Sequence, residues 1–209
     1  MMDQQTAAQI AVQVMMGVSL AACAGLRAWL PMMAVGLMGR MGLIALNPTF
    51  SFLESTPALV VFGVATLLEL LGDKVIAVDH ALDVVGTFVR PLAGTLLVAA
   101  ALSKTDPMVA LVAGLVVGGG TALTVHSGKA AARTQSTSLA LFHGGVGNAA
   151  LSLIEDGLSV MGSVLAVLLP VLAFVLALGL LAASLVFIYL FWRAGRKLWR
   201  LLAGVPPAR

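Results

Sequence analysis

The chain has 209 residues, of which 60% are hydrophobic and only 10% are charged, and its formal net charge is +3. Soluble domains carry about 25% charged residues. One core could not hide this much apolar surface, so the composition excludes an ordinary soluble domain and predicts a polytopic membrane protein. The small positive charge gives no reason to expect nucleic acid as a partner, because much of it lies in the C-terminal "RAGRKLWR", which suits a membrane surface.

Six apolar segments follow one another along the chain. The predicted membrane spans are residues 8–38, 58–72, 87–102, 108–126, 147–169 and 171–192. We therefore predict an all-α fold of about six spans in a single integral membrane domain, residues 1–209, with a basic tail at 193–209.

The first segment contains "GLRAWLP", where an arginine and a proline interrupt apolar sequence. Pro31 removes a backbone donor and disfavours the helical conformation at the residue before it, and Gly25 adds local freedom. We predict a kink or an unwound turn between Gly25 and Pro31. The side chain of Arg27 should point into the protein, because an arginine facing lipid costs at least about 2.5–3.5 kcal/mol.

The placement of lysine and arginine predicts the orientation. The segment "SGKAAARTQSTS" leaves the apolar zone and is predicted to be a connector between spans. The basic residues predicted on one side of the membrane are Lys129, Arg133, Arg193, Arg196, Lys197 and Arg200, against Arg40 and Lys104 on the other. The side richer in basic residues is expected to be cytoplasmic, which puts both termini inside.

A weak internal repeat relates residues 8–102 to residues 107–192. "GVSLAACAGLRA" opens the first half and "GLVVGGGTALTVHSGKAAAR" the second, and "ATLLELLGDKV" resembles "ALSLIEDGLSV". Three spans in each half would invert one half relative to the other, as in many transporters. Recurrent small residues alone could also produce the likeness, so both explanations stay open.

Residues 69–91 concentrate seven ionisable side chains between apolar stretches: Glu69, Asp73, Lys74, Asp79, His80, Asp83 and Arg90. If 69–83 were one helix, Glu69, Asp73, His80 and Asp83 would share a face, although Gly72 could break that helix. Acids and an imidazole could bind a cation or relay protons. The metal-ligand candidates are Asp79, His80 and Asp83. The alternative is a solvated connector with ordinary ion pairs.

Four charged residues, of which Arg90 is named above, lie within or beside predicted spans. Arg27 and Arg90 could hold an anionic group, because the guanidinium fork suits carboxylates and phosphates. The alternative for Arg27 is a structural ion pair with Glu69 or Glu155. Glu155 and Asp156 are adjacent on a helix and therefore point in different directions, so we expect that not both face lipid.

Four stretches, "AGLRAWLP", "ELLGDKVIAVDHALDVVGTFVRPLAG", "TALTVHSGKAAAR" and "GNAALSLIEDGLSV", together resemble one bacterial family of small polytopic membrane proteins. The family is known only as a domain of unknown function, number four-one-two-six. The resemblance spans roughly residues 17–170 and brings no established activity. It implies that these residues belong to the family pattern: Arg27, Glu69, Asp73, Asp79, His80, Asp83, Arg90, His126, Glu155 and Asp156.

These patterns favour an inner-membrane transporter or channel-like protein that binds a small ion or an anionic amphiphile. The expected binding residues are Arg27, Glu69, Asp73, His80, Asp83, Arg90, Glu155 and Asp156. The expected partners are membrane lipids and the transported ion or amphiphile; a homo-oligomer stays open. No cofactor is expected, although a bound cation is not excluded. The alternatives are a scaffold with structural ion pairs and a Mg-dependent membrane enzyme that uses Asp79 and Asp83, and an enzyme is the less favoured class.

Overall fold

The computed structural model describes residues 4–72, 76–140 and 146–202, and no strand occurs among them. The helices are α1 (Gln4–Leu26), α2 (Trp29–Arg40), the 3₁₀ helix η1 (Pro48–Glu54), α3 (Thr56–Gly72), α4 (Ile76–Ala101), α5 (Pro107–Ala113), the π-helix η2 (Gly114–Gly119), α6 (Gly120–Ala140), α7 (Val146–Leu168) and α8 (Pro170–Leu202). The predicted all-α polytopic class is confirmed.

Each of the six predicted spans lies on helical sequence, but one predicted boundary is wrong. Helix α4 begins at Ile76, and its part that is apolar enough to span, Val84–Ala101, agrees with the predicted span 87–102. Helix α6 continues to Ala140, so the segment "SGKAAARTQSTS" that we expected to form a connector is helical. The reason is tertiary packing, because α6 lies against α1 and α8 and its basic residues find partners on α1 and α7.

Four helices of the described residues are long and apolar enough to cross a membrane, namely Thr6–Leu26, Val84–Ala101, Pro107–Arg133 and Pro170–Arg196. The pair η1 and α3, bent by 59°, would make a fifth span if it counts as one. Helix α2 has only 12 residues, or about 18 Å, against a hydrocarbon core of about 30 Å. It is therefore a half-length helix that continues α1 after a break.

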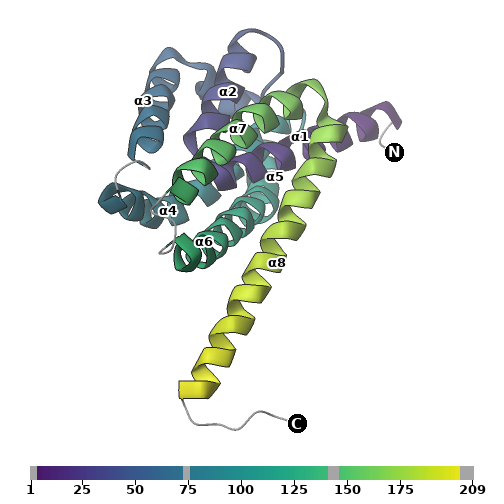
Figure 1. Cartoon of the computed structure of the whole chain (residues 1–209). Coiled ribbons are helices and arrows are strands. Elements are labelled where there is room, and N and C mark those ends of the chain that lie inside the picture. The colour runs from purple at the N-terminus through teal and green to yellow at the C-terminus, as the bar shows by residue number, and fades with distance from the viewer. Residues whose placement is uncertain (1–3, 73–75, 141–145, 203–209) are drawn as a thin grey trace.

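Helix α1 lies at the centre of the bundle (Figure 1), where it packs against α4, α6, α7 and α8. Its residues from Met16 to Leu26 are all buried. Small side chains permit this packing: a Cβ added to Gly25 would lie 2.6 Å from the Cβ of Val125 and 2.7 Å from the carbonyl oxygen of Ala122. Helices α1 and α6 therefore approach each other more closely than any larger residue at position 25 would allow.

Three glycines of "GLVVGGG" serve close packing, as helix-contact glycines do in membranes: Gly114, Gly118 and Gly119. A Cβ on Gly94 of α4 would lie 2.5 Å from the carbonyl oxygen of Gly118. The same stretch, Gly114–Gly119, is wound as a π-helix between α5 and α6. The second half therefore stays helical where the first half is broken after α1, and the inverted repeat remains a prediction.

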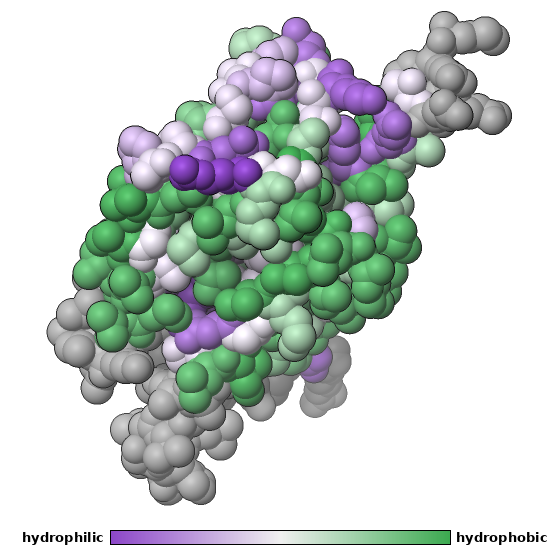
Figure 2. Space-filling model, turned by 90° about the horizontal axis from the view of Figure 1, so that it is seen from above, coloured by the Kyte–Doolittle hydropathy of each residue, from purple (hydrophilic) through white to green (hydrophobic). Residues whose placement is uncertain are grey.

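The outer surface is largely apolar. Figure 2 shows hydrophobic side chains over most of the visible face, with hydrophilic residues gathered mainly toward one edge. Helix α8 has 33 residues, or about 50 Å, and projects beyond the bundle (Figure 1). Its exposed apolar residues, such as Val175 and Leu185, are those expected to contact lipid tails.

Candidate functional site

The chain leaves its helical path at Arg27 and Ala28, between α1 and α2. Both residues are buried, with exposed fractions of 1% and 2%. Pro31 falls in the first turn of α2, where a missing N–H does no harm. The predicted break between Gly25 and Pro31 and the inward direction of the Arg27 side chain are both confirmed.

Charged side chains from other helices bind the two helix ends at this break. The carbonyl oxygen of Leu26, at the end of α1, accepts a hydrogen bond of 3.2 Å from Nζ of Lys129. The N–H of Ala28, at the start of α2, donates over 3.4 Å to Oε1 of Glu69. A cation at a helix C-terminus and an anion at a helix N-terminus both match the helix dipole. Side chains from α6 and α3 therefore satisfy backbone groups that have no partner within α1 or α2.

Glu69 belongs to α3 and reaches Arg90 of α4. Oε1 of Glu69 lies 3.4 Å from Nη2 of Arg90, and both residues are buried. The other guanidinium nitrogen, Nη1, contacts Nδ1 of His126 on α6. Nε2 of the same imidazole lies 3.5 Å from Nη1 of Arg90 and 3.2 Å from Oγ1 of Thr87. The four side chains form one chain of polar contacts across α3, α4 and α6.

Two basic residues of α6 share one acid of α7. Oε2 of Glu155 lies 2.9 Å from Nζ of Lys129 and 2.9 Å from Nη2 of Arg133. Lys129 is only 7% exposed and Glu155 only 5%. Two cations thus meet one carboxylate, and we call Lys129, Arg133 and Glu155 the basic triad.

Arg27 is held by α7 through the residue next to Glu155. Nε of Arg27 lies 2.7 Å from Oδ1 of Asp156, and its Nη2 donates to Oγ of Ser152 over 2.8 Å. On the same helix, Oγ of Ser159 donates to the carbonyl oxygen of Cys23 over 3.4 Å. Glu155 and Asp156 therefore face different partners, one on α6 and one at the helix break, as adjacent residues of a helix must.

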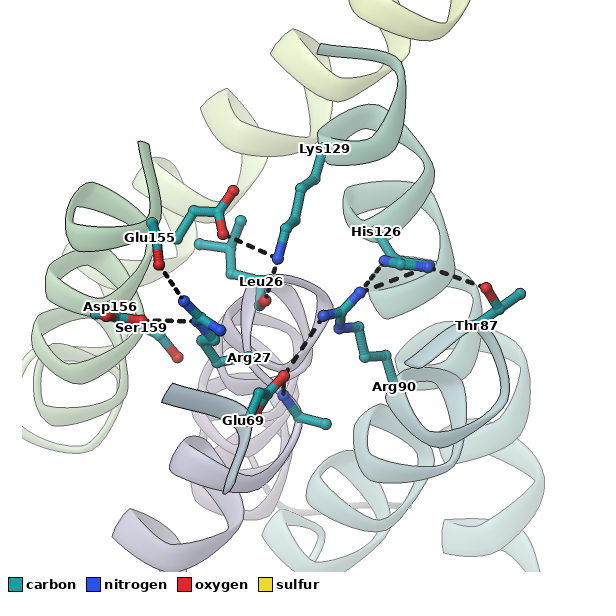
Figure 3. Close-up of polar contacts among 12 residues, drawn as sticks. Leu26, Arg27, Glu69, Thr87, Arg90, His126, Lys129, Glu155, Asp156 and Ser159 are labelled. Atoms are coloured by element: carbon teal, nitrogen blue, oxygen red, sulfur yellow. Dashed lines mark hydrogen bonds and ion pairs between the residues drawn. The ribbon is translucent and has the colours of Figure 1, made fainter. Parts of the chain in front are cut away.

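Figure 3 shows most of these groups converging around the break, with side chains from α3, α4, α6 and α7 near the end of α1. The charged site, as we call it, consists of Arg27, Glu69, Arg90, His126, Lys129, Arg133, Glu155 and Asp156. Of the residues that the sequence singled out for binding, the structure brings together Arg27, Glu69, Arg90, Glu155 and Asp156.

The other predicted site residues cannot be placed. Asp73 lies outside the described residues, as do the side chains of Asp79, His80 and Asp83. Of the two possibilities for 69–83, one helix or a break at Gly72, the described residues favour the break, because α3 runs to Gly72 and α4, from Ile76, points in another direction (Figure 1). Among the side chains that the structure does describe, no three His, Cys, Asp or Glu residues come together as a metal site.

Sequence reasoning missed Lys129 and Arg133 as site residues and placed both in a cytoplasmic connector. Lys129 is instead buried inside the bundle. Its partners, Leu26 and Glu155, are distant in sequence, so no local pattern reveals them. His126 entered only through the family pattern. With Lys129 inside the bundle, fewer basic residues in loops support the predicted orientation in the membrane, which remains a prediction.

Comparison with known proteins identifies a family but no characterised relative. The family model described as a domain of unknown function, DUF4126, matches residues 14–190, which is most of the chain and confirms the resemblance found in the sequence. No curated protein matches, and no solved structure matches.

Proposed function

The chain belongs to the DUF4126 family, and we propose that it is a membrane transporter that binds a small ion or an anionic amphiphile at the break between α1 and α2. The observation that carries this proposal is the buried break itself, whose two helix ends are bound by charged side chains from α3 and α6. In many secondary transporters, substrate and coupling ions bind at the ends of interrupted helices.

A purely structural role for the broken helix is the alternative to transport. Non-helical backbone at membrane depth is tolerated only where it is buried in protein or lines a cavity. A helix needs no break in order to carry an ion pair, so a purely structural role leaves the interruption at Arg27 unexplained. At this break Lys129 binds the carbonyl of Leu26 and Glu69 binds the N–H of Ala28. A ligand there would meet both a positively and a negatively charged side chain.

Glu69 is the residue best suited to a coupling cation or proton. Its Oε1 is engaged by Ala28 and Arg90. Its Oε2 is buried and makes no hydrogen bond within the part of the chain that the structure describes. A buried carboxylate oxygen without a donor is costly in an apolar setting, and a proton or a cation would remove that cost.

A scaffold without transport is the second candidate, and the ion pairs of the interior favour it. Arg27 contacts Asp156, Arg90 contacts Glu69, and Lys129 contacts Glu155. Pairing of this kind holds helices together whether or not a ligand binds. The two candidates differ in one measurable respect: a scaffold moves nothing across a membrane.

The test is flux in vesicles that contain the purified protein. One set carries an entrapped pH-sensitive dye under imposed proton and sodium gradients. The other carries phosphatidylglycerol with a fluorescent label on an acyl chain. Quenching by dithionite reports the movement of this lipid between the leaflets. We expect flux above that of empty vesicles in one set, and its loss in the uncharged double variant Arg27→Gln, Asp156→Asn.

The matched control is Arg40→Gln, which changes an exposed arginine bound to Thr56 at the end of α2. It should leave flux at the wild-type level. Flux no greater than that of empty vesicles in both sets, or equal flux in the double variant, would overturn transport at the break and favour the scaffold.

A further inference from the structure

A pocket of about 260 Å³ lies between α1, α7 and α8. Cys23 and Leu26 line it from α1, Met161 and Leu158 from α7, and Ala177 from α8. The lining is almost entirely apolar. One of its few polar side chains, Ser19, donates to the carbonyl oxygen of Met15 over 2.7 Å, so its hydroxyl group is already satisfied. The pocket therefore suits hydrocarbon.

The mouth of this pocket faces the lipid. Two of its walls, α1 and α8, are candidate membrane spans. Leu158, Met161 and Leu176 of the lining are 49%, 63% and 55% exposed, so they form an open rim on the apolar surface. In a membrane, the groups that surround such a rim are acyl chains. The available occupant is therefore a chain that enters sideways from the bilayer.

One end of the pocket meets the charged site. Leu26 lines the pocket, and its carbonyl oxygen accepts the hydrogen bond from Lys129. Glu155 stands one helical turn before Leu158, another lining residue, and binds Lys129 and Arg133. The basic triad, with two cationic side chains, thus lies beside an apolar pocket. That combination fits a molecule with a negative head and a hydrocarbon tail.

We propose that the pocket between α1, α7 and α8 holds part of one hydrocarbon chain of an anionic amphiphile, whose head group binds at the basic triad. This inference rests on the proposed function and names its substrate class, an anionic amphiphile instead of a small ion. Pockets for drug-sized ligands measure about 300–1,000 Å³. The smaller volume here takes a segment of one chain and leaves the rest of the molecule in the bilayer.

Binding, which does not depend on flux, tests the inference. The purified protein is mixed with phosphatidylglycerol or with phosphatidylcholine of the same chains, and native mass spectrometry counts the bound lipids. The variant Ala177→Phe fills the pocket from α8, where Ala177 is 6% exposed. The matched control Ala183→Phe makes the same change at an exposed position of α8. A photoreactive, diazirine-bearing phosphatidylglycerol cross-links to the protein and so identifies the residues that the bound lipid contacts.

We expect at least a fivefold preference for phosphatidylglycerol in the wild type and in Ala183→Phe, and its loss in Ala177→Phe. Cross-links should fall on pocket residues such as Met161. Equal binding of both lipids would overturn the anionic head group, and undiminished binding by Ala177→Phe would overturn the pocket. Selective binding without flux would reject transport and leave this site in place. Flux of protons or sodium without lipid binding would support transport and reject this lipid site.

Discussion

The ammonium nitrogen of Lys129 lies 3.2 Å from the carbonyl oxygen of Leu26, the last residue of α1. A lysine of α6 thus binds the end of a helix that is 103 residues away in sequence. The same ammonium contacts Glu155 over 2.9 Å. One buried cation therefore joins three helices at the point where the central helix stops, and its removal should affect the whole bundle.

The variant Lys129→Met should lower stability by about 1–3 kcal/mol, because it leaves the buried carbonyl of Leu26 without its donor, while Glu155 keeps Arg133. The measurement is the thermal unfolding midpoint in detergent. Lys104→Met is the matched control, since Lys104 is exposed and bonds only to Gln9 among the described contacts. That control should stay within about 0.5 kcal/mol of wild type. Equal midpoints for the two variants would contradict the role of Lys129.

The pair Arg27 and Asp156 should respond asymmetrically. The side chain of Arg27 is 1% exposed, whereas that of Asp156 is 24% exposed. Asp156→Asn takes a carboxylate from a fully buried guanidinium, while Arg27→Met leaves an acid that water can still reach. We therefore expect Asp156→Asn to lower the unfolding midpoint more than Arg27→Met does.

A double-mutant cycle checks this pair. The combination Arg27→Met, Asp156→Asn should recover part of the loss, because neither charge is then left behind. Strictly additive losses would show that the 2.7 Å contact does not couple the two residues. A larger loss for Arg27→Met than for Asp156→Asn would show that exposure does not control the cost.

The topology predicted from the sequence is tested by reporter fusions at residues 104 and 209. With six crossings, both termini lie inside and residue 104 lies outside, because it follows the third span. The structure contains four helices able to cross, or five with the bent pair, so the experiment also decides whether α7 spans. Reporters on the same side would refute the six-span arrangement.

Local sequence signals were sufficient for the break at Arg27, because Pro31 and a solitary arginine in apolar sequence act within one turn of each other. They were also sufficient for the helices, since long apolar runs in lipid have few alternatives to helix. The convergence of Glu69 and Arg90 was expected because both are charges that apolar surroundings force inward.

The partners of these charges could not be read from the sequence. Arg27 was expected beside Glu69 or Glu155, and the structure places Asp156 against it. Adjacent acids on α7 differ by about 100° in direction, and only the packing of α7 decides which one meets the break. Lys129 sits among Ser, Gly and Thr residues that look like a loop, because its buried partners come from α1 and α7.

The close contact of α1 with α6 predicts a matched pair of glycine variants. Gly25→Ala should destabilise, because the new Cβ would lie 2.6 Å from the Cβ of Val125 and neither helix can move without disturbing the break. Gly120→Ala, on α6, meets nothing within 4 Å and should be neutral or stabilising by about 0.5–1 kcal/mol. Equal unfolding midpoints for the two variants would mean that this contact does not limit the bundle.

The hydrogen bond from Ala28 to Glu69 gives the last prediction. Glu69→Gln keeps an acceptor for the N–H of Ala28 but loses the charge that Arg90 contacts, whereas Glu69→Ala loses both. Hydrogen–deuterium exchange should therefore rise at the start of α2 in the order wild type, Glu69→Gln, Glu69→Ala. Glu54→Ala changes a partly exposed glutamate of η1; it is the control and should leave exchange at residues 28–30 unchanged. If Glu69→Ala exchanges there no faster than wild type, Glu69 does not hold the start of α2, and the break would depend on Pro31 and packing alone.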